Sequence, residues 1–174
     1  MIKFVTTLVV FLVSTIMFGQ SVFDKFDGQE EVSTIIVNKK MFEMMSKVKA
    51  NDKETQQYVN LLKKLDNLKV FITSSSKQTA EMRATADKYL KTAGMDELMR
   101  ISDGGKNVKI YMRSGANDSI VKELFMFIEG NAKDNETVLF SLTGNFNLDE
   151  ISALTEQMNL PGGDNLKKAS KGNK

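Results

Sequence analysis

Glu123 is the residue whose type and setting most suggest a functional role, because it is an acidic residue at the head of the apolar run Leu124–Ile128. Successive side chains of a strand point to opposite faces, so Glu123 should share a face with Val121, Phe125 and Phe127. Both faces are then apolar beyond the start of the strand. This pattern predicts a central strand that is covered on both sides.

Two roles are open to Glu123. It could form an ion pair with a cation on the preceding strand, such as Lys109 or Arg113, or it could be a partly buried carboxylate in a ligand site. We favour the ion pair, because structural ion pairs use the same geometry. Such a cross-strand pair at a strand end should contribute at most about 1 kcal/mol to stability.

The chain contains no His and no Cys. It therefore has no Ser-His-Asp triad, no thiol nucleophile, and no imidazole or thiolate ligand for a metal. Carboxylate, Lys or Tyr chemistry and a cation site built from oxygens remain possible. The acidic residues near the start of the mature chain do not have the spacing of a calcium loop. These residues are Asp24, Asp27, Glu30 and Glu31. We predict no catalytic residue, no cofactor and no metal site.

The N-terminal residues have the order of a secretory signal peptide. Lys3 precedes an uncharged, mostly apolar run from Phe4 to Phe18, and Gly19–Ser21 ends it. The run is short for a spanning helix, which needs about 20 residues. We predict a signal peptide at residues 1–20 and export to the periplasm or the extracellular space. Because the chain has no Cys, we expect that the mature protein is not a lipoprotein. It also has no second long apolar run, so we expect no stable membrane insertion after the signal peptide is removed.

The first half of the mature domain should alternate strands with helices. β-branched runs predict strands at about 32–38 and 68–74. Asn38 is placed to cap the helix after the first strand, while Asn51 and Glu54, and later Ser75 and Gln78, have capping-box spacing. Gly94 stands where a glycine ends the helix that precedes it. Two or three helices are therefore expected.

The second half predicts a four-strand antiparallel meander. Its short apolar-alternating runs are ELMRIS, NVKIYMRS, IVKELFMFIEG and TVLFSLTG. Gly104 and Gly105 should form the tightest hairpin, with at least one of them at positive φ. Asn147 and Glu150 have capping-box spacing and should begin a helix whose apolar face carries Leu148, Ile151, Leu154 and Met158.

These elements predict one α+β domain over residues 21–160. We expect a mixed sheet of about six strands with two or three helices packed on one face. The Gly- and Lys-rich segment 161–174 should be a disordered tail.

The order of the blocks resembles that of a known family. VSTIIVNKKMFEMM, LDNLKVFITSS, MDELMRISDGGKNVKIYMR, IVKELFMFIEG and VLFSLTGNFNLDEISAL are similar to the domain-of-unknown-function family 4252 of exported Bacteroidota proteins. The Glu-Leu pair in VKELFMFIEG, followed by LTG and a short acidic helix, is the most telling part. The family has no assigned activity, so the resemblance supplies no catalytic residue.

Two further expectations come from this resemblance. The segment DSI at Asp118–Ile120 is similar to the O-glycosylation acceptor common in that phylum, with Ser119 as the attachment point in a predicted loop. Family members near extracytoplasmic sigma factors suggest a regulator of envelope stress as one alternative function.

Composition and motifs together favour a non-catalytic binding or interaction domain in the cell envelope. A carboxylate- or Lys-based hydrolase is the other alternative, and two buried carboxylates converging in a deep pocket would favour it. The expected partner is another envelope protein or a ligand. A net charge of +2 and the absence of Trp argue against nucleic acid, and the sequence leaves the oligomeric state open.

Overall fold

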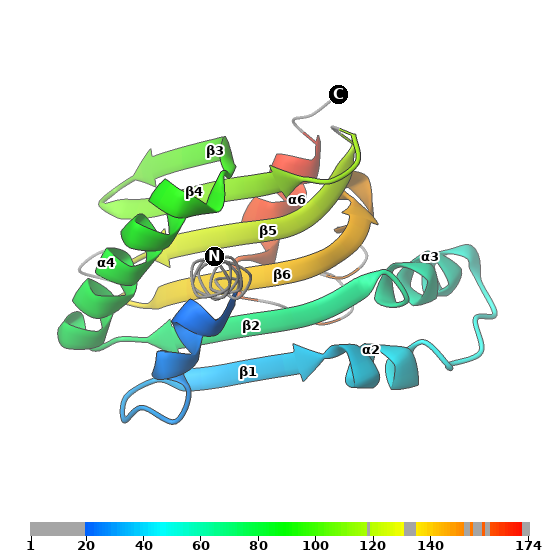
Figure 1. Cartoon of the computed structure of the whole chain (residues 1–174), viewed down its shortest axis with the longest axis horizontal. Helices are drawn as coiled ribbons and strands as arrows, with labels where there is room; N and C mark the ends of the chain where they lie inside the picture. The colour runs from blue at the N-terminus through cyan, green and yellow to red at the C-terminus, as the bar shows by residue number, and fades with distance from the viewer. Residues whose placement is uncertain are drawn as a thin grey trace, which may run out of the picture.

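The computed structural model describes residues 20–117, 119–130, 135–151, 154, 158 and 161–171. The predicted signal peptide lies outside the described residues, except for Gln20. Within these ranges the chain folds as an α+β domain built on one six-stranded sheet (Figure 1). The predicted fold class is therefore confirmed.

The sheet has the strand order β1-β2-β6-β5-β4-β3, and each neighbouring pair is antiparallel. The four-strand meander is confirmed as β3 to β6, and β5 is a central strand, as expected. The strands are β1 (Ser33–Asn38), β2 (Leu65–Thr73), β3 (Asp96–Asp103), β4 (Lys106–Ser114), β5 (Ile120–Glu129) and β6 (Thr137–Asn147).

The prediction of a mixed sheet is wrong in this detail. The chain leaves β1 at Asn38, passes through helices α2 (Lys39–Met45) and α3 (Lys53–Leu62), and returns to the same end of the sheet, where Asn67 of β2 lies opposite Asn38. β2 must then run antiparallel to β1. The sequence predicts the helices, but not the end of the sheet to which they return the chain.

Helices cover both faces of the sheet rather than one (Figure 1). The short 3₁₀ helix η1 (Gln20–Phe26) and α4 (Ser76–Ala93) pack on one face, where Phe23, Phe71 and Phe125 are fully buried. The turn η2 (Leu148–Glu150) and α6 (Gly163–Lys171) pack on the opposite face. Both faces need cover because β5 and β6 present apolar side chains on each.

Helix α6 occupies the segment that we predicted to be a disordered tail, and this part of the prediction is corrected. Leu166 is fully buried and Ala169 is 6% exposed, and both belong to the larger core. One Leu and one Ala three residues apart in a Lys-rich segment are too weak a periodic pattern to predict a helix. The face of the sheet on which they pack supplies the stabilisation that the local sequence lacks.

The helix ends follow the predicted caps in part. Asn38 accepts a hydrogen bond from the Met41 amide (3.0 Å), and Gly94 ends α4 in the left-handed conformation. The cap of α3 is Asp52 rather than Asn51, since Asp52 accepts from the Thr55 amide (2.8 Å). Ser75 precedes α4 but makes no side-chain cap bond.

The two remaining turn predictions are confirmed. Gly104 and Gly105 have φ values of +54° and +86°, the pair of positive values that a tight hairpin requires. Asn147 and Glu150 form a capping box, although it opens the 3₁₀ turn η2. Beyond it, Ile151 and Leu154 are fully buried in the larger core, as the predicted apolar face requires.

Candidate functional site: the buried Glu123 network

A β-bulge in β5 sets the direction of the Glu123 side chain. On the neighbouring strand β4, the consecutive residues Arg113 and Ser114 lie opposite Glu123 and Val121, so Lys122 is an extra residue in β5. One extra residue reverses the facing of every side chain before it. Val121 therefore packs in the larger core with η2 and α6, while Glu123 faces α4. The expectation that Val121 and Glu123 share a face is wrong for this reason.

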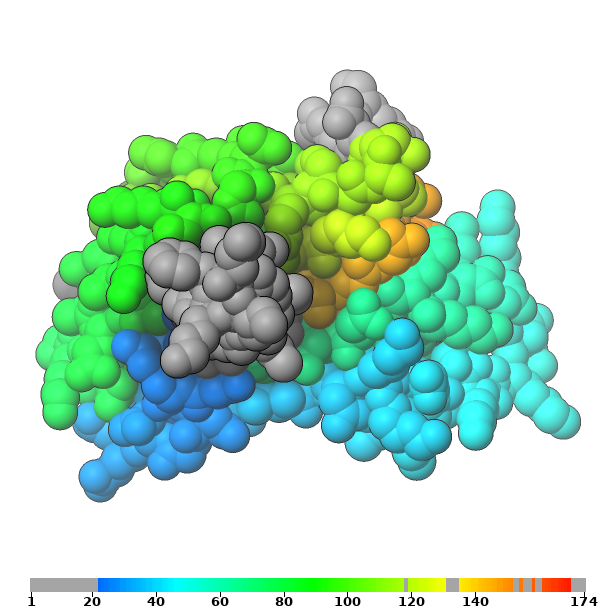
Figure 2. Space-filling model, in the orientation of Figure 1, coloured from blue at the N-terminus to red at the C-terminus, as the bar shows by residue number. Residues whose placement is uncertain are grey.

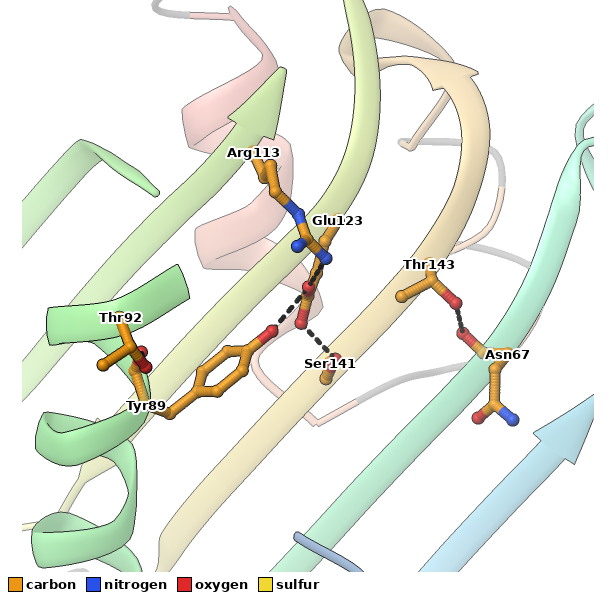
Figure 3. Close-up of polar contacts among 7 residues, drawn as sticks. All are labelled: Asn67, Tyr89, Thr92, Arg113, Glu123, Ser141 and Thr143. Atoms are coloured by element: carbon orange, nitrogen blue, oxygen red, sulfur yellow. Dashed lines mark hydrogen bonds and ion pairs between the residues drawn. The ribbon is translucent and has the colours of Figure 1, made fainter. Parts of the chain in front are cut away.

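The carboxylate of Glu123 is fully buried and accepts three hydrogen bonds from three different elements (Figure 3). The Tyr89 hydroxyl of α4 donates to Oε2 at 2.7 Å. Nη2 of Arg113 on β4 donates to the same oxygen at 2.5 Å. The Ser141 hydroxyl of β6 donates to Oε1 at 3.0 Å. These three hydrogen bonds take the place of those that water makes to an exposed carboxylate.

Of the two cross-strand cations that the sequence suggested, Lys109 and Arg113, the structure selects Arg113. It lies directly opposite Glu123 in the β4–β5 register, whereas Lys109 lies opposite Phe127. The Arg113 side chain is 40% exposed, so it joins the buried carboxylate to the surface. Its Nε atom is buried and has no hydrogen-bond partner among the described residues. The ion pair is thus confirmed, but it is far more buried than a pair at a strand end.

Tyr89 is one of the two hydroxyl donors of the network, with Ser141. Its ring packs edge-on against Phe23, with ring centroids 5.0 Å apart, and tilted against Phe125 at 5.9 Å. Burial above all, and then the charge and hydrogen bond of Glu123, raise the pKa of Tyr89, while Arg113 lowers it. The hydroxyl therefore stays protonated and donates a hydrogen bond to the carboxylate.

A cavity of about 780 Å³ lies beside the network, between α4 and η1. Tyr89 and Arg113 form part of its wall, and Val22, Ala84 and Ala93 contribute apolar surface. Among the described residues, its charged lining consists of Lys25, Lys88 and Arg113 against one acid, Glu81. The cavity therefore combines an apolar wall with an excess of positive charge, next to a guanidinium that Glu123 holds in place.

An ion pair that involves a second buried charge attaches η1 to the sheet. Lys69 of β2 is 7% exposed and forms an ion pair with Asp24 of η1. The Asp24 side chain remains 55% exposed, but through this pair it contacts β2. Lys25, the next residue, has its Nζ 4.9 Å from the centre of the Phe26 ring. Both contacts hold the η1 side of the cavity in position.

Sequence reasoning missed Tyr89 and Ser141 as partners of Glu123. Tyr89 lies on the apolar face of α4, where its spacing is typical of a core residue. Ser141 carried a usable signal, because it is a polar residue inside the apolar run of β6. A buried polar residue in each of two adjacent strands suggests that the two side chains bond to each other.

Ser119 lies on the surface, in the turn between β4 and β5. Its amide donates to Oδ1 of Asn117 at 3.1 Å. Asp118, the first residue of the DSI segment, lies outside the described residues. The loop position that we predicted for Ser119 is confirmed, and it is separate from the Glu123 network.

In the part of the chain that the structure describes, no three carboxylates gather as they would to hold a metal ion. Among the same residues, no helix has the length and apolar composition to cross a membrane.

Comparison with known proteins returns one family. A family model described as a domain of unknown function (DUF4252) matches residues 26–154. No curated protein and no solved structure matches the chain. The matched region contains all six strands, Glu123 and its three partners.

Proposed function

The chain belongs to the DUF4252 family, and we propose that it is an exported, non-catalytic binding module that holds a small amphipathic anion in the cavity beside Glu123. The observation that carries this proposal is the position of Arg113. Its guanidinium is fixed from one side by a buried carboxylate and lines the cavity on the other. Such a preorganised cation is well suited to recognise a carboxylate, sulfonate or phosphate group.

The ligand should be anionic and partly apolar. In the described part of the lining, Lys25, Lys88 and Arg113 outnumber the one acid, Glu81, and this balance favours a negative group. Val22, Ala84 and Ala93 offer apolar surface to the rest of the ligand. A concave, partly apolar site with a few placed polar groups is the usual form of a small-molecule site.

A binding role fits the state of the Glu123 carboxylate better than a catalytic role. Both of its oxygens already accept hydrogen bonds, and the carboxylate is fully buried. A general base needs a free acceptor within reach of its substrate. Among the described residues Glu123 is the only buried acidic side chain, so the converging pair that would favour the hydrolase alternative is not formed there.

Export is supported by the order of charges and apolar residues in the first twenty positions. The folded domain begins immediately afterwards, since Phe23 and Phe26 are buried between η1 and the sheet. Removal of a signal peptide before Val22 would leave these anchors in the mature protein.

Binding can be tested with two fluorescent probes of similar size, anionic 1-anilinonaphthalene-8-sulfonate and neutral N-phenyl-1-naphthylamine. We expect saturable 1:1 binding of the sulfonate, with at least about tenfold weaker binding of the neutral probe, which corresponds to about 1.4 kcal/mol. Equal affinity for the two probes, or no saturable binding of the sulfonate, would contradict the proposal.

Two pairs of variants on α4 locate the site. Ala84→Trp should fill the cavity and abolish binding, whereas Ala80→Trp, on an exposed position of the same helix outside the lining, should not. Lys88→Glu should weaken binding of the sulfonate, whereas Lys91→Glu, also exposed and outside the lining, should leave it unchanged. If Ala84→Trp binds the probe as the parent protein does, the cavity is not the site.

A further inference from the structure

The two edges of the sheet differ in their protection against pairing with another strand. The edge strand β3 carries the charged residues Asp96, Glu97, Arg100 and Asp103, which is a common way to block edge pairing. The opposite edge strand, β1, has the sequence STIIVN and no charged residue. β1 lies at the edge of the sheet (Figure 1), so no strand in the described part of the chain pairs with its outer backbone groups.

The surface around β1 is also unusually apolar. Ile35 and Ile36 are 39% and 42% exposed, on opposite faces of the same edge strand. Met41 and Met44 of α2, and Val48 beyond it, are the other large exposed apolar residues in the described part of the chain. All five fall within residues 35–48, a segment whose colours run along the surface of the molecule in Figure 2. Exposed large apolar residues gathered in one segment indicate an interaction site.

The charges at the two ends of β1 indicate which partner fits. Glu30 and Glu31 precede the strand, and Lys39 and Lys40 follow it; all four residues are exposed. If a second copy pairs with β1 in the antiparallel direction, the acidic end of each strand lies beside the basic end of the other. The edge is therefore complementary to itself, as a two-fold symmetric interface must be.

We propose that two copies of this protein associate through antiparallel pairing of their β1 strands, which joins the two sheets into one. Ile35 and Ile36 lie at the centre of the pairing, near the two-fold axis. The two Glu-Lys clusters flank it and set the direction of the strands. Met41 and Met44 extend the apolar contact beyond the strand itself. The cavity beside α4 lies away from this edge, so the inference is independent of the ligand proposed above.

The mass of the purified protein, measured by sedimentation equilibrium after expression of the full chain, tests the proposal. The parent protein should reach twice the mass of one chain as its concentration rises. Ile35→Lys should remain at the mass of one chain, since it places two like charges at the two-fold axis. Ile35 is a better position than Ile36, which lies opposite the buried Lys69. Ser102→Lys, an exposed position on the other edge strand, should dimerise like the parent.

A charge exchange tests the direction of pairing. Lys40→Glu should weaken dimerisation, and adding Glu31→Lys to it should restore dimerisation to near the parent level. Thermal melting of each variant confirms that the fold is retained, because all substituted positions are exposed. A monomeric parent protein, an unaffected Ile35→Lys dimer, or a Lys40→Glu variant that dimerises like the parent would each overturn the proposal.

Discussion

At the scale of single residues, Glu123 is a buried carboxylate that the fold pairs with a guanidinium and two hydroxyl donors. An isolated ionised carboxylate in such a position would cost several kcal/mol. Tyr89, Arg113 and Ser141 each donate one hydrogen bond to it, so the network joins α4, β4, β5 and β6 around one side chain. Glu123 has two roles: it stabilises the fold, and it holds Arg113 at the cavity. Substitution separates them, because stability and ligand binding are measured independently.

Glu123→Gln should lower the free energy of unfolding by roughly 2–3 kcal/mol. The amide leaves Arg113 without its counter-ion and turns one acceptor into a donor that faces other donors. The loss stays below the value for a fully buried pair because Arg113 is 40% exposed and can be solvated. Urea titration measures the effect.

The matched control for Glu123→Gln is Glu129→Gln. Glu129 forms a bidentate pair with Arg83 that is partly exposed, with 48% of the Arg83 and 28% of the Glu129 side chain accessible, so its loss should be about 1 kcal/mol or less. If Glu123→Gln is as stable as the parent and loses sulfonate binding, then Glu123 acts mainly in the ligand site. Our structural interpretation of the network would then be wrong.

The raised pKa of Tyr89 predicts that the folded protein loses stability in alkaline solution. Its folded-state pKa is raised above the usual value of about 10, so near and above that pH the unfolded chain releases a proton that the folded chain retains. The contribution of Tyr89 is fully present below pH 10 and is lost as the pH rises towards its folded-state pKa.

Tyr89→Phe isolates this titration. The variant should be less stable than the parent by a constant amount below about pH 9, because a hydrogen bond to Glu123 is lost. Above pH 10 the difference should shrink. Denaturant titrations of both proteins at several pH values give the comparison, since the other titrating groups are common to both. A difference that stays constant to pH 11 would contradict the raised pKa.

At the scale of elements, bulges determine how the strands fit together. Irregular register occurs in β2 between Leu65 and Asn67 and in β5 between Val121 and Glu123. Strand β6 lies between these two strands, and its Gly144 lies opposite Leu65 of β2. The chain approaches so closely that a Cβ atom on Gly144 would lie 2.4 Å from the carbonyl oxygen of Lys64 and 3.0 Å from the Cα atom of Leu65.

Gly144→Ala should therefore destabilise the protein by about 1–3 kcal/mol, because the clash is with main-chain atoms that cannot rotate away. Gly115→Ala is the control. Its Cβ would also be close to a neighbour, at 2.7 Å, but that neighbour is the Cγ2 methyl of the Ile120 side chain. Gly115→Ala should cost less, as judged by the melting temperature. Equal costs would show that the β2–β6 contact relaxes more easily than its geometry indicates.

At the scale of the whole molecule, the predicted signal peptide at residues 1–20 can be tested by measuring mass. We expect the intact mass of the exported protein to be smaller than that of the full chain by about 20 residues. Cleavage further into the chain would remove Phe23 and Phe26, which are buried against the sheet, and should prevent folding. Recovery of the full-length chain in the membrane fraction would show that the segment is an anchor and not a signal peptide.

Local patterns in the sequence determined most of the secondary structure. The six strands, the hairpin at Gly104–Gly105, the left-handed end of α4 at Gly94 and the capping box at Asn147 each depend on residues a few positions apart. The sequence also limited the partner of Glu123 to Lys109 or Arg113 on the preceding strand of the meander, and the register of the structure then selected Arg113.

Only the tertiary structure decided the rest. The antiparallel direction of β2, the bulge at Lys122, the burial of α6 and the contribution of Tyr89 and Ser141 to the Glu123 network all depend on residues distant in the sequence. Such contacts are stabilised by packing between elements, which overrides weak local preferences and leaves no periodic signal in the chain. The sequence therefore showed that Glu123 was unusual, but the meeting of three elements around it made it the centre of a site.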